Sequence, residues 1–172
     1  MSKILLQLLV PFVLAPLLAG CTSTAPDAVD LSQRVVFDSA TDTTGGFAGP
    51  LASDHSTIVV RSEAEWQALW YGIHNNGTGD PVNVALPPVD FSREMLVGIG
   101  VGRRTNGCYA ARITDVADVE GQRVVVAKEV SSDGCPGLIC TGSASVSPVL
   151  IVAVGRTDLP VYFQWRAETT CP

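Results

Sequence analysis

The second half of the chain is dominated by short segments rich in valine, isoleucine and other strand-forming residues. Five such segments follow Asp90, and each is separated from the next by a turn that contains glycine or proline. They span residues 95–101, 109–116, 123–130, 146–154 and 161–165. Short β-branched runs bounded by turn residues are typical of strands. Five strands in succession predict an antiparallel meander.

Two further strands and one helix are predicted before Asp90. Residues 33–39 and 57–61 form apolar, β-branched runs. Ser62 and Glu65 have the spacing of a capping box, in which a hydroxyl and a carboxylate satisfy free N–H groups at the start of a helix. The apolar residues of the expected helix repeat on one face: Trp66, Leu69, Trp70 and Ile73.

These elements predict one domain over residues 33–172, which is long enough to bury a core of its own. The predicted fold class is mainly β (α+β). We expect an antiparallel sheet, or a small sandwich or barrel, with one amphipathic helix near residues 62–73.

Three glycines alternate with apolar residues in the first strand after Asp90. Gly98, Gly100 and Gly102 all fall on one side of a strand, because side chains alternate between its two faces. A face without side chains allows close approach of another part of the chain. We expect the predicted helix or a second sheet to pack there, in preference to a ligand.

The N-terminal segment is typical of a bacterial lipoprotein signal. A lysine precedes a nearly unbroken apolar run, and residues 18–21 read Leu-Ala-Gly-Cys. This ending resembles a lipobox, which implies cleavage after residue 20 and lipid on Cys21; an ordinary signal peptide is the alternative. Residues 21–32 are then a lipidated cysteine and a flexible tether. The residue after the cysteine is Thr22 and not aspartate, which favours the outer membrane, facing the periplasm or the cell surface.

The charge balance argues against nucleic acid as a partner. Removal of residues 1–20 takes away one of 11 basic residues and none of 17 acidic ones, leaving a net charge of −7. A nucleic-acid-binding domain needs a basic surface to neutralise phosphates.

Four cysteines remain after Cys21, and an even number in an exported protein indicates disulfides. From the meander we expect Cys108 to pair with Cys135 and Cys140 with Cys171. The pairing of Cys108 with Cys140 and Cys135 with Cys171 stays open, and so does a short bridge between Cys135 and Cys140. A four-cysteine zinc site is disfavoured, because no two cysteines are separated by just two residues.

Residues that would signal catalysis are few. The histidines, His55 and His74, have no metal-ligand spacing and are expected to be solvated or locally hydrogen-bonded. No Gly-x-Ser-x-Gly or Ser-x-x-Lys pattern occurs. Gly98 and Gly100 do not continue to a third glycine in nucleotide-binding register, since Arg103 occupies that position. We predict no catalytic residue, no cofactor and no metal.

Three motifs occur in a familiar order. Residues 59–66 read Val-Val-Arg-Ser-Glu-Ala-Glu-Trp, residues 89–97 read Val-Asp-Phe-Ser-Arg-Glu-Met-Leu-Val, and residues 102–109 read Gly-Arg-Arg-Thr-Asn-Gly-Cys-Tyr. Together they resemble the PrcB-type domain, named for a lipoprotein subunit of a bacterial surface protease complex. The resemblance covers roughly residues 57–155. Asn106 and Cys108 depart from the usual glycine run of the third motif, which suggests a turn pinned by a disulfide.

The resemblance implies a subunit that supports the assembly or stability of a protease without being the protease itself. It offers no catalytic residues to carry over. The third motif is the candidate partner contact, and its alternative role is simple closure of a tight hairpin. The contact residues would be Arg103, Arg104, Thr105, Asn106, Gly107 and Tyr109.

The sequence therefore predicts a non-enzymatic, lipid-anchored envelope protein that binds or stabilises another envelope protein, for which the resemblance suggests a protease. One alternative is an exported module that binds a small ligand or a peptide, the latter by strand addition to an open sheet edge. The other is a hydrolase with an unfamiliar site.

Overall fold

The computed structural model describes residues 33–41, 49–74, 84–140 and 146–171. Its elements in chain order are β1 (Arg34–Asp38), β2 (Ser56–Val60), α1 (Glu63–His74), β3 (Glu94–Gly100), β4 (Tyr109–Val119), β5 (Gln122–Ser131), β6 (Val149–Gly155) and β7 (Val161–Thr169).

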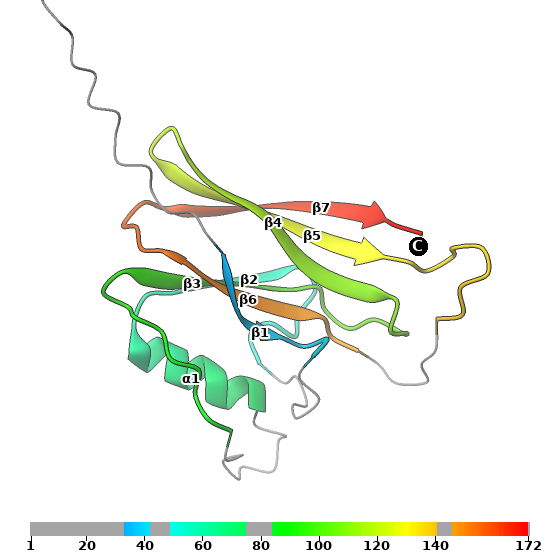
Figure 1. Ribbon diagram of the computed structural model, residues 1–172, viewed down its shortest axis with the longest axis horizontal. Helices are drawn as coiled ribbons and strands as arrows, with labels where there is room; N and C mark the ends of the chain where they lie inside the picture. The colour runs from blue at the N-terminus through cyan, green and yellow to red at the C-terminus, as the bar shows by residue number, and fades with distance from the viewer. Residues whose placement is uncertain (1–32, 42–48, 75–83, 141–145, 172) are drawn as a thin grey trace, which may run out of the picture.

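The strands form two sheets that pack face to face, and the helix covers the outer face of the larger one (Figure 1). The larger sheet has the order β1-β6-β3-β2, and the smaller has the order β4-β5-β7. Within the described residues neither sheet closes into a barrel. The predicted mainly β fold, with a small sandwich and one helix, is confirmed.

The main core lies between the two sheets. Alternate residues of β3 point into it, including Met95, Val97 and Ile99, each fully buried. They meet inward residues of the smaller sheet such as Val125 and Ala127. The intervening residues of β3 face the helix, so both faces of this central strand are covered. This double burial explains why β3 and β6 are nearly continuous apolar runs.

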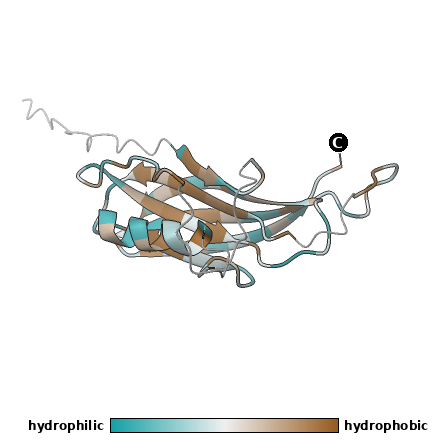
Figure 2. Cartoon of the chain, turned by 90° about the horizontal axis from the view of Figure 1, so that it is seen from below, coloured by the Kyte–Doolittle hydropathy of each residue, from teal (hydrophilic) through white to brown (hydrophobic). Residues whose placement is uncertain are grey.

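A second core lies between α1 and the larger sheet, and the strands are coloured mostly as hydrophobic in Figure 2. Trp66, Leu69, Trp70 and Ile73 are all buried there, as the helical spacing predicts. The tryptophan N–H groups are satisfied by backbone, since Trp66 donates to the carbonyl of Pro87 and Trp70 to that of Val84.

The capping box of α1 forms as predicted. The Ser62 hydroxyl accepts from the N–H of Glu65, and the Glu65 carboxylate accepts from the N–H groups of Ser62 and Arg61 at 3.1 and 2.8 Å. The hydrogen bond from the Arg61 backbone is the largest cause that lowers the pKa of Glu65. These contacts fix where the helix begins.

The glycine face of β3 is covered from the helix side of the sheet. A Cβ on Gly98 would lie 2.8 Å from Ile58, and one on Gly100 would lie 1.9 Å from the carbonyl oxygen of Leu51. Leu51 belongs to the segment before β2 and is buried in the helix-side core. The glycines therefore allow close packing of the chain, but against the segment before β2 and the Ile58 side chain, and not against the helix or a second sheet as expected.

The expected antiparallel meander is wrong at every connection except the β4–β5 hairpin, because β3 and β4 already lie in different sheets. β6 lies in the larger sheet between β1 and β3, and β7 crosses to the smaller sheet. There it pairs with β5 in parallel, from Arg123 opposite Val161 to Ser131 opposite Thr169. The connection after β6 crosses from the larger sheet to the smaller one and is not a hairpin turn. The last two strands of the chain, β6 and β7, therefore complete one sheet each.

Candidate functional site

The predicted partner-contact turn lies at one end of the sandwich, where it carries the chain from β3 to β4. Residues 101–108, residues 132–140, residues 170–171 and the beginning of β2 all meet at this end, which we call the disulfide end. The chain enters β1 at the opposite end, because Arg34 pairs with Ala153 near the end of β6.

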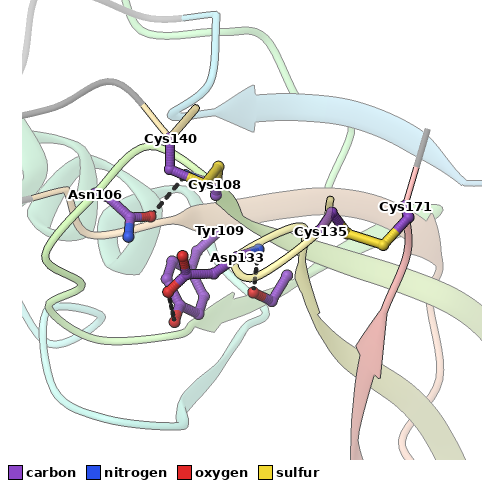
Figure 3. Close-up of a disulfide and its surroundings, with 8 residues drawn as sticks. Asn106, Cys108, Tyr109, Asp133, Cys135, Cys140 and Cys171 are labelled. Atoms are coloured by element: carbon purple, nitrogen blue, oxygen red, sulfur yellow. Dashed lines mark hydrogen bonds between the residues drawn. A yellow bond between two sulfur atoms is a disulfide. The ribbon is translucent and has the colours of Figure 1, made fainter. Parts of the chain in front are cut away.

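Two disulfides clamp this end, and they correct the preferred cysteine pairing. Cys108 is bonded to Cys140 and Cys135 to Cys171, with Cα atoms 5.4 and 5.5 Å apart (Figure 3). The expected pairs assumed that β7 returns beside β6. Because β7 instead runs parallel to β5, its end brings Cys171 to Cys135, just beyond the end of β5. All four cysteines do gather at one end, as predicted.

The four thiols are consumed in these bonds, which leaves none to ligate zinc. No group of three or more potential metal ligands is found among the described residues.

Arg104 is the centre of an ion-pair network and not a free arginine of the turn. Its guanidinium donates to both carboxylate oxygens of Glu129 at 2.8 and 2.9 Å, and to Asp54 at 3.0 Å. Its backbone pairs with Val146. The hydrogen bonds to Glu129 are the largest cause that raises the pKa of Arg104, and the same bonds lower the pKa of Glu129. Arg104 thus joins the β3–β4 turn to β5.

His55 completes the network from the other sheet. Its Nε2 lies 2.9 Å from the Glu129 carboxylate, and its ring lies 4.6 Å from that of Trp165 on β7. The residue has φ of +48°, a left-handed conformation that aims its side chain across the gap between the sheets. His55 is therefore hydrogen-bonded to a residue 74 positions away and not locally as expected, and it ties the beginning of β2 to the smaller sheet.

His74, in contrast, is hydrogen-bonded within its own element, as expected. It is buried at the end of α1, and its Nδ1 lies 3.0 Å from the carbonyl oxygen of Trp70. Phe37 and Trp70 contact its ring. The two histidines lie in different parts of the fold and do not share a site.

The remaining residues of the turn are held mainly by their own neighbours. Asn106 accepts a hydrogen bond from the N–H of Cys108 at 3.0 Å, and the Tyr109 hydroxyl donates to Asp133 at 3.2 Å (Figure 3). The guanidinium of Arg104 lies 5.6 Å from the centre of the Tyr109 ring. Arg103, Thr105 and Gly107 are exposed.

Gly102 is required by the shape of the turn. It has φ of +84°, and a Cβ there would lie 2.7 Å from the Cα of Asp54. Glycine is the residue that reaches this conformation without strain. The turn is thus a rigid corner packed against the segment before β2, and its exposed side chains are the ones that a partner would meet.

The most exposed apolar side chains of this end lie on a different loop, between β5 and β6. Leu138 and Ile139 form its tip, and they are 39% and 83% exposed. Cys135 and Cys140 flank them, each in a disulfide, and two glycines, at positions 134 and 137, shape the backbone at φ of +81° and +77°. Figure 1 shows this loop projecting from the end of the molecule beyond β5, and Figure 2 shows apolar colouring on it.

Sequence reasoning did not single out this tip. The available signal was a Leu-Ile pair between two cysteines in a segment that carries two glycines and a proline. Disulfides restrict the conformations of the loop that they close. The tip therefore presents two apolar side chains to solvent on a backbone with little freedom to fold them inward.

Comparison with family models, with curated proteins and with solved structures finds no match for this chain. The resemblance to PrcB-type domains therefore stays a prediction made from the sequence motifs. The signal, Cys21 and the tether lie outside the described residues. Among the residues that the structure does describe, no helix is long and apolar enough to span a bilayer.

Proposed function

We propose that this chain is a lipid-anchored envelope protein that binds and stabilises another envelope protein and does not itself catalyse a reaction. The observation that carries the proposal is the disulfide-clamped tip formed by Leu138 and Ile139. Exposed apolar side chains cost little when scattered over a surface, but a projecting pair held by two covalent bonds is typical of a contact site.

The geometry of the neighbouring turn supports the same surface. Arg103 and Thr105 are exposed there, and Arg104 is bonded to Glu129 and Asp54. A partner docked on the disulfide end would meet the apolar tip together with the outer side chains of the turn. An apolar centre with a polar rim is the common anatomy of protein interfaces.

The position of the tip favours a protein over the anchoring membrane. Residues 1–33 join the domain at Arg34, and Arg34 lies at the end of the sandwich opposite to the tip. A lipid on Cys21 would attach the domain to the bilayer from that opposite end, through the tether of residues 21–32. The tip would then be directed away from the point of attachment, towards other components of the envelope.

The experiment is co-purification of tagged full-length protein from detergent-solubilised envelopes, with bound proteins identified by mass spectrometry. Ile139→Asp should abolish recovery of a stoichiometric partner. Val119→Asp is the matched control, since Val119 is an exposed valine at the far end of β4. Equal recovery with both variants, or no partner with the wild type, would refute the proposal. The lipid anchor is tested separately by growing cells with labelled fatty acid. The wild-type protein should carry the label, and Cys21→Ser should not.

A further inference from the structure

Among the described residues the sandwich has four edge strands, and three of them carry features that discourage pairing with another chain. β1 and β2 have only five residues each, and β1 is also interrupted by an irregularity between Val35 and Phe37. β4 is longer, but its register shifts between Ile113 and Asp115. Short strands and bulges are the usual means by which proteins protect sheet edges.

β7 is the exception. It is nine residues long, and all nine pair with β5 in an unbroken register. It contains no proline and no lysine. Apart from this ladder, no backbone–backbone hydrogen bond of the described residues involves the strand. Because alternate residues of a strand direct their N–H and C=O groups to opposite sides, the side of β7 away from β5 offers a row of groups for another strand.

The side chains of β7 are suited to a second copy of the same strand. If two β7 strands pair antiparallel about Trp165, all nine residues overlap. On the outer face Tyr162 then lies opposite Glu168, and Gln164 lies opposite Arg166. Neither pair brings like charges directly opposite one another, which would be unfavourable.

The inner face is also complementary in this register. Phe163 lies opposite the small Ala167, and Trp165 lies opposite its own copy. Phe163 and Trp165 pack against the core between the sheets but remain only half-buried, because no strand covers them on the open side. Cross-strand aromatic pairs of this kind stabilise sheets.

We infer that β7 is a dimerisation edge, and that two copies of this chain join their three-stranded sheets into one six-stranded sheet through antiparallel β7 strands centred on Trp165. The contact is isologous, so it closes as a dimer and does not propagate.

Cysteine cross-linking between differently substituted copies tests the register. Full-length Tyr162→Cys and Glu168→Cys proteins are purified separately in detergent and mixed under mild oxidation. The mixture should give a covalent dimer, because the two positions face each other, while each variant alone should not. Tyr162→Cys mixed with Gln164→Cys is the matched control. Position 164 is four residues away from position 168, which faces Tyr162 in the proposed register, so this mixture should stay uncross-linked. Equal cross-linking in both mixtures would overturn the inference.

Substitution at Tyr162 tests the contact without a cross-link. Tyr162→Glu places carboxylates opposite each other at two symmetric positions and should raise the dimer dissociation constant about tenfold. Tyr162→Lys places a cation opposite Glu168 and should retain the dimer. Light scattering over a concentration series gives the mass. A wild-type protein that is monomeric at all concentrations overturns the inference. If Tyr162→Glu also fails to recover the envelope protein that co-purifies with the wild type, the β7 edge binds that partner and not a second copy.

The dimer edge and the apolar tip are tested by different residues. Tyr162 lies at the beginning of β7, whereas Cys171, which is bonded to the loop carrying Ile139, follows its end. Loss of dimers with co-purification of the partner intact would therefore assign the failure to the β7 edge. Loss of the partner with dimers intact would assign it to the apolar tip.

Discussion

The guanidinium of Arg104 and the carboxylate of Glu129 form a two-point ion pair that joins the β3–β4 turn to the end of β5. Their side chains are only 19% and 13% exposed. Pairs shielded to this degree are screened less by water than surface pairs are, and removal of one member leaves the other without compensation.

Arg104→Met should lower the free energy of unfolding by about 2 kcal/mol, because it leaves Glu129 with His55 as its remaining partner. Urea unfolding followed by tryptophan fluorescence measures the change. Arg93→Met is the matched control, since Arg93 pairs with Asp90 and its own side chain is 82% exposed. Exposed ion pairs contribute about 0–1 kcal/mol, so a loss as large in the control would contradict the role assigned to Arg104.

Stability should also fall in acid through Glu129. Its pKa in the folded protein lies below its ordinary value of 4.5, first because of hydrogen bonds from Arg104. A group with a depressed folded pKa adds stability at pH values above its unfolded pKa and loses it as the pH falls through the folded pKa. Unfolding free energy measured between pH 7 and pH 3 should therefore decline below about pH 4.5.

Glu129→Gln isolates this contribution. The variant should be less stable at pH 7, and its curve below about pH 4.5 should be flatter than that of the wild type. Parallel curves for the two proteins would show that other carboxylates account for the acid sensitivity, among them Asp118, whose pKa is lowered by hydrogen bonds from Arg123.

Each disulfide should contribute comparably to stability, because the two close loops of similar length, with sequence separations of 32 and 36 residues. Joint replacement of Cys108 and Cys140 by alanine, or of Cys135 and Cys171, should cost about 3–4 kcal/mol. Thermal unfolding with and without reductant checks the magnitude. Peptide mapping of the non-reduced protein checks the connectivity, and a fragment joining Cys108 to Cys135 would contradict it.

Two glycines should respond to alanine in opposite directions. Gly100→Ala would place a Cβ against the backbone of Leu51 and should destabilise the domain by about 2 kcal/mol or more. Gly72 lies in α1, where an added methyl group would have no neighbour within 4 Å, so Gly72→Ala should stabilise by about 0.5–1 kcal/mol. Chemical denaturation of both variants measures the contrast, and a Gly100→Ala protein as stable as the wild type would refute the close approach.

Local sequence patterns were sufficient to predict the elements of this fold. The capping box at Ser62 and the stripe from Trp66 to Ile73 define α1, and β4 begins at Tyr109 as expected. Such features depend on residues a few positions apart, where backbone geometry determines which side chains share a face.

The arrangement of the last strands could not be deduced in the same way. The short connection after Gly155 is compatible with a hairpin and with a crossing to the other sheet, and only packing of β7 on β5 decides between them. The Arg104 network was missed for a similar reason. Its partners lie 50 positions before it and 25 after it, so no local spacing marks them.

The alternating connectivity of the disulfides sets a condition on how this protein matures. If the chain is exported into an oxidising compartment, as we propose, Cys108 and Cys135 are the first pair of domain thiols to become available, yet they do not bond to each other in the native fold. Oxidation in order of appearance would trap that wrong bridge. A chain oxidised in that order would reach the native pairing only by thiol–disulfide exchange after residues 140 and 171 arrive, so we expect the yield of correctly bonded protein to depend on a disulfide isomerase and not on an oxidase alone.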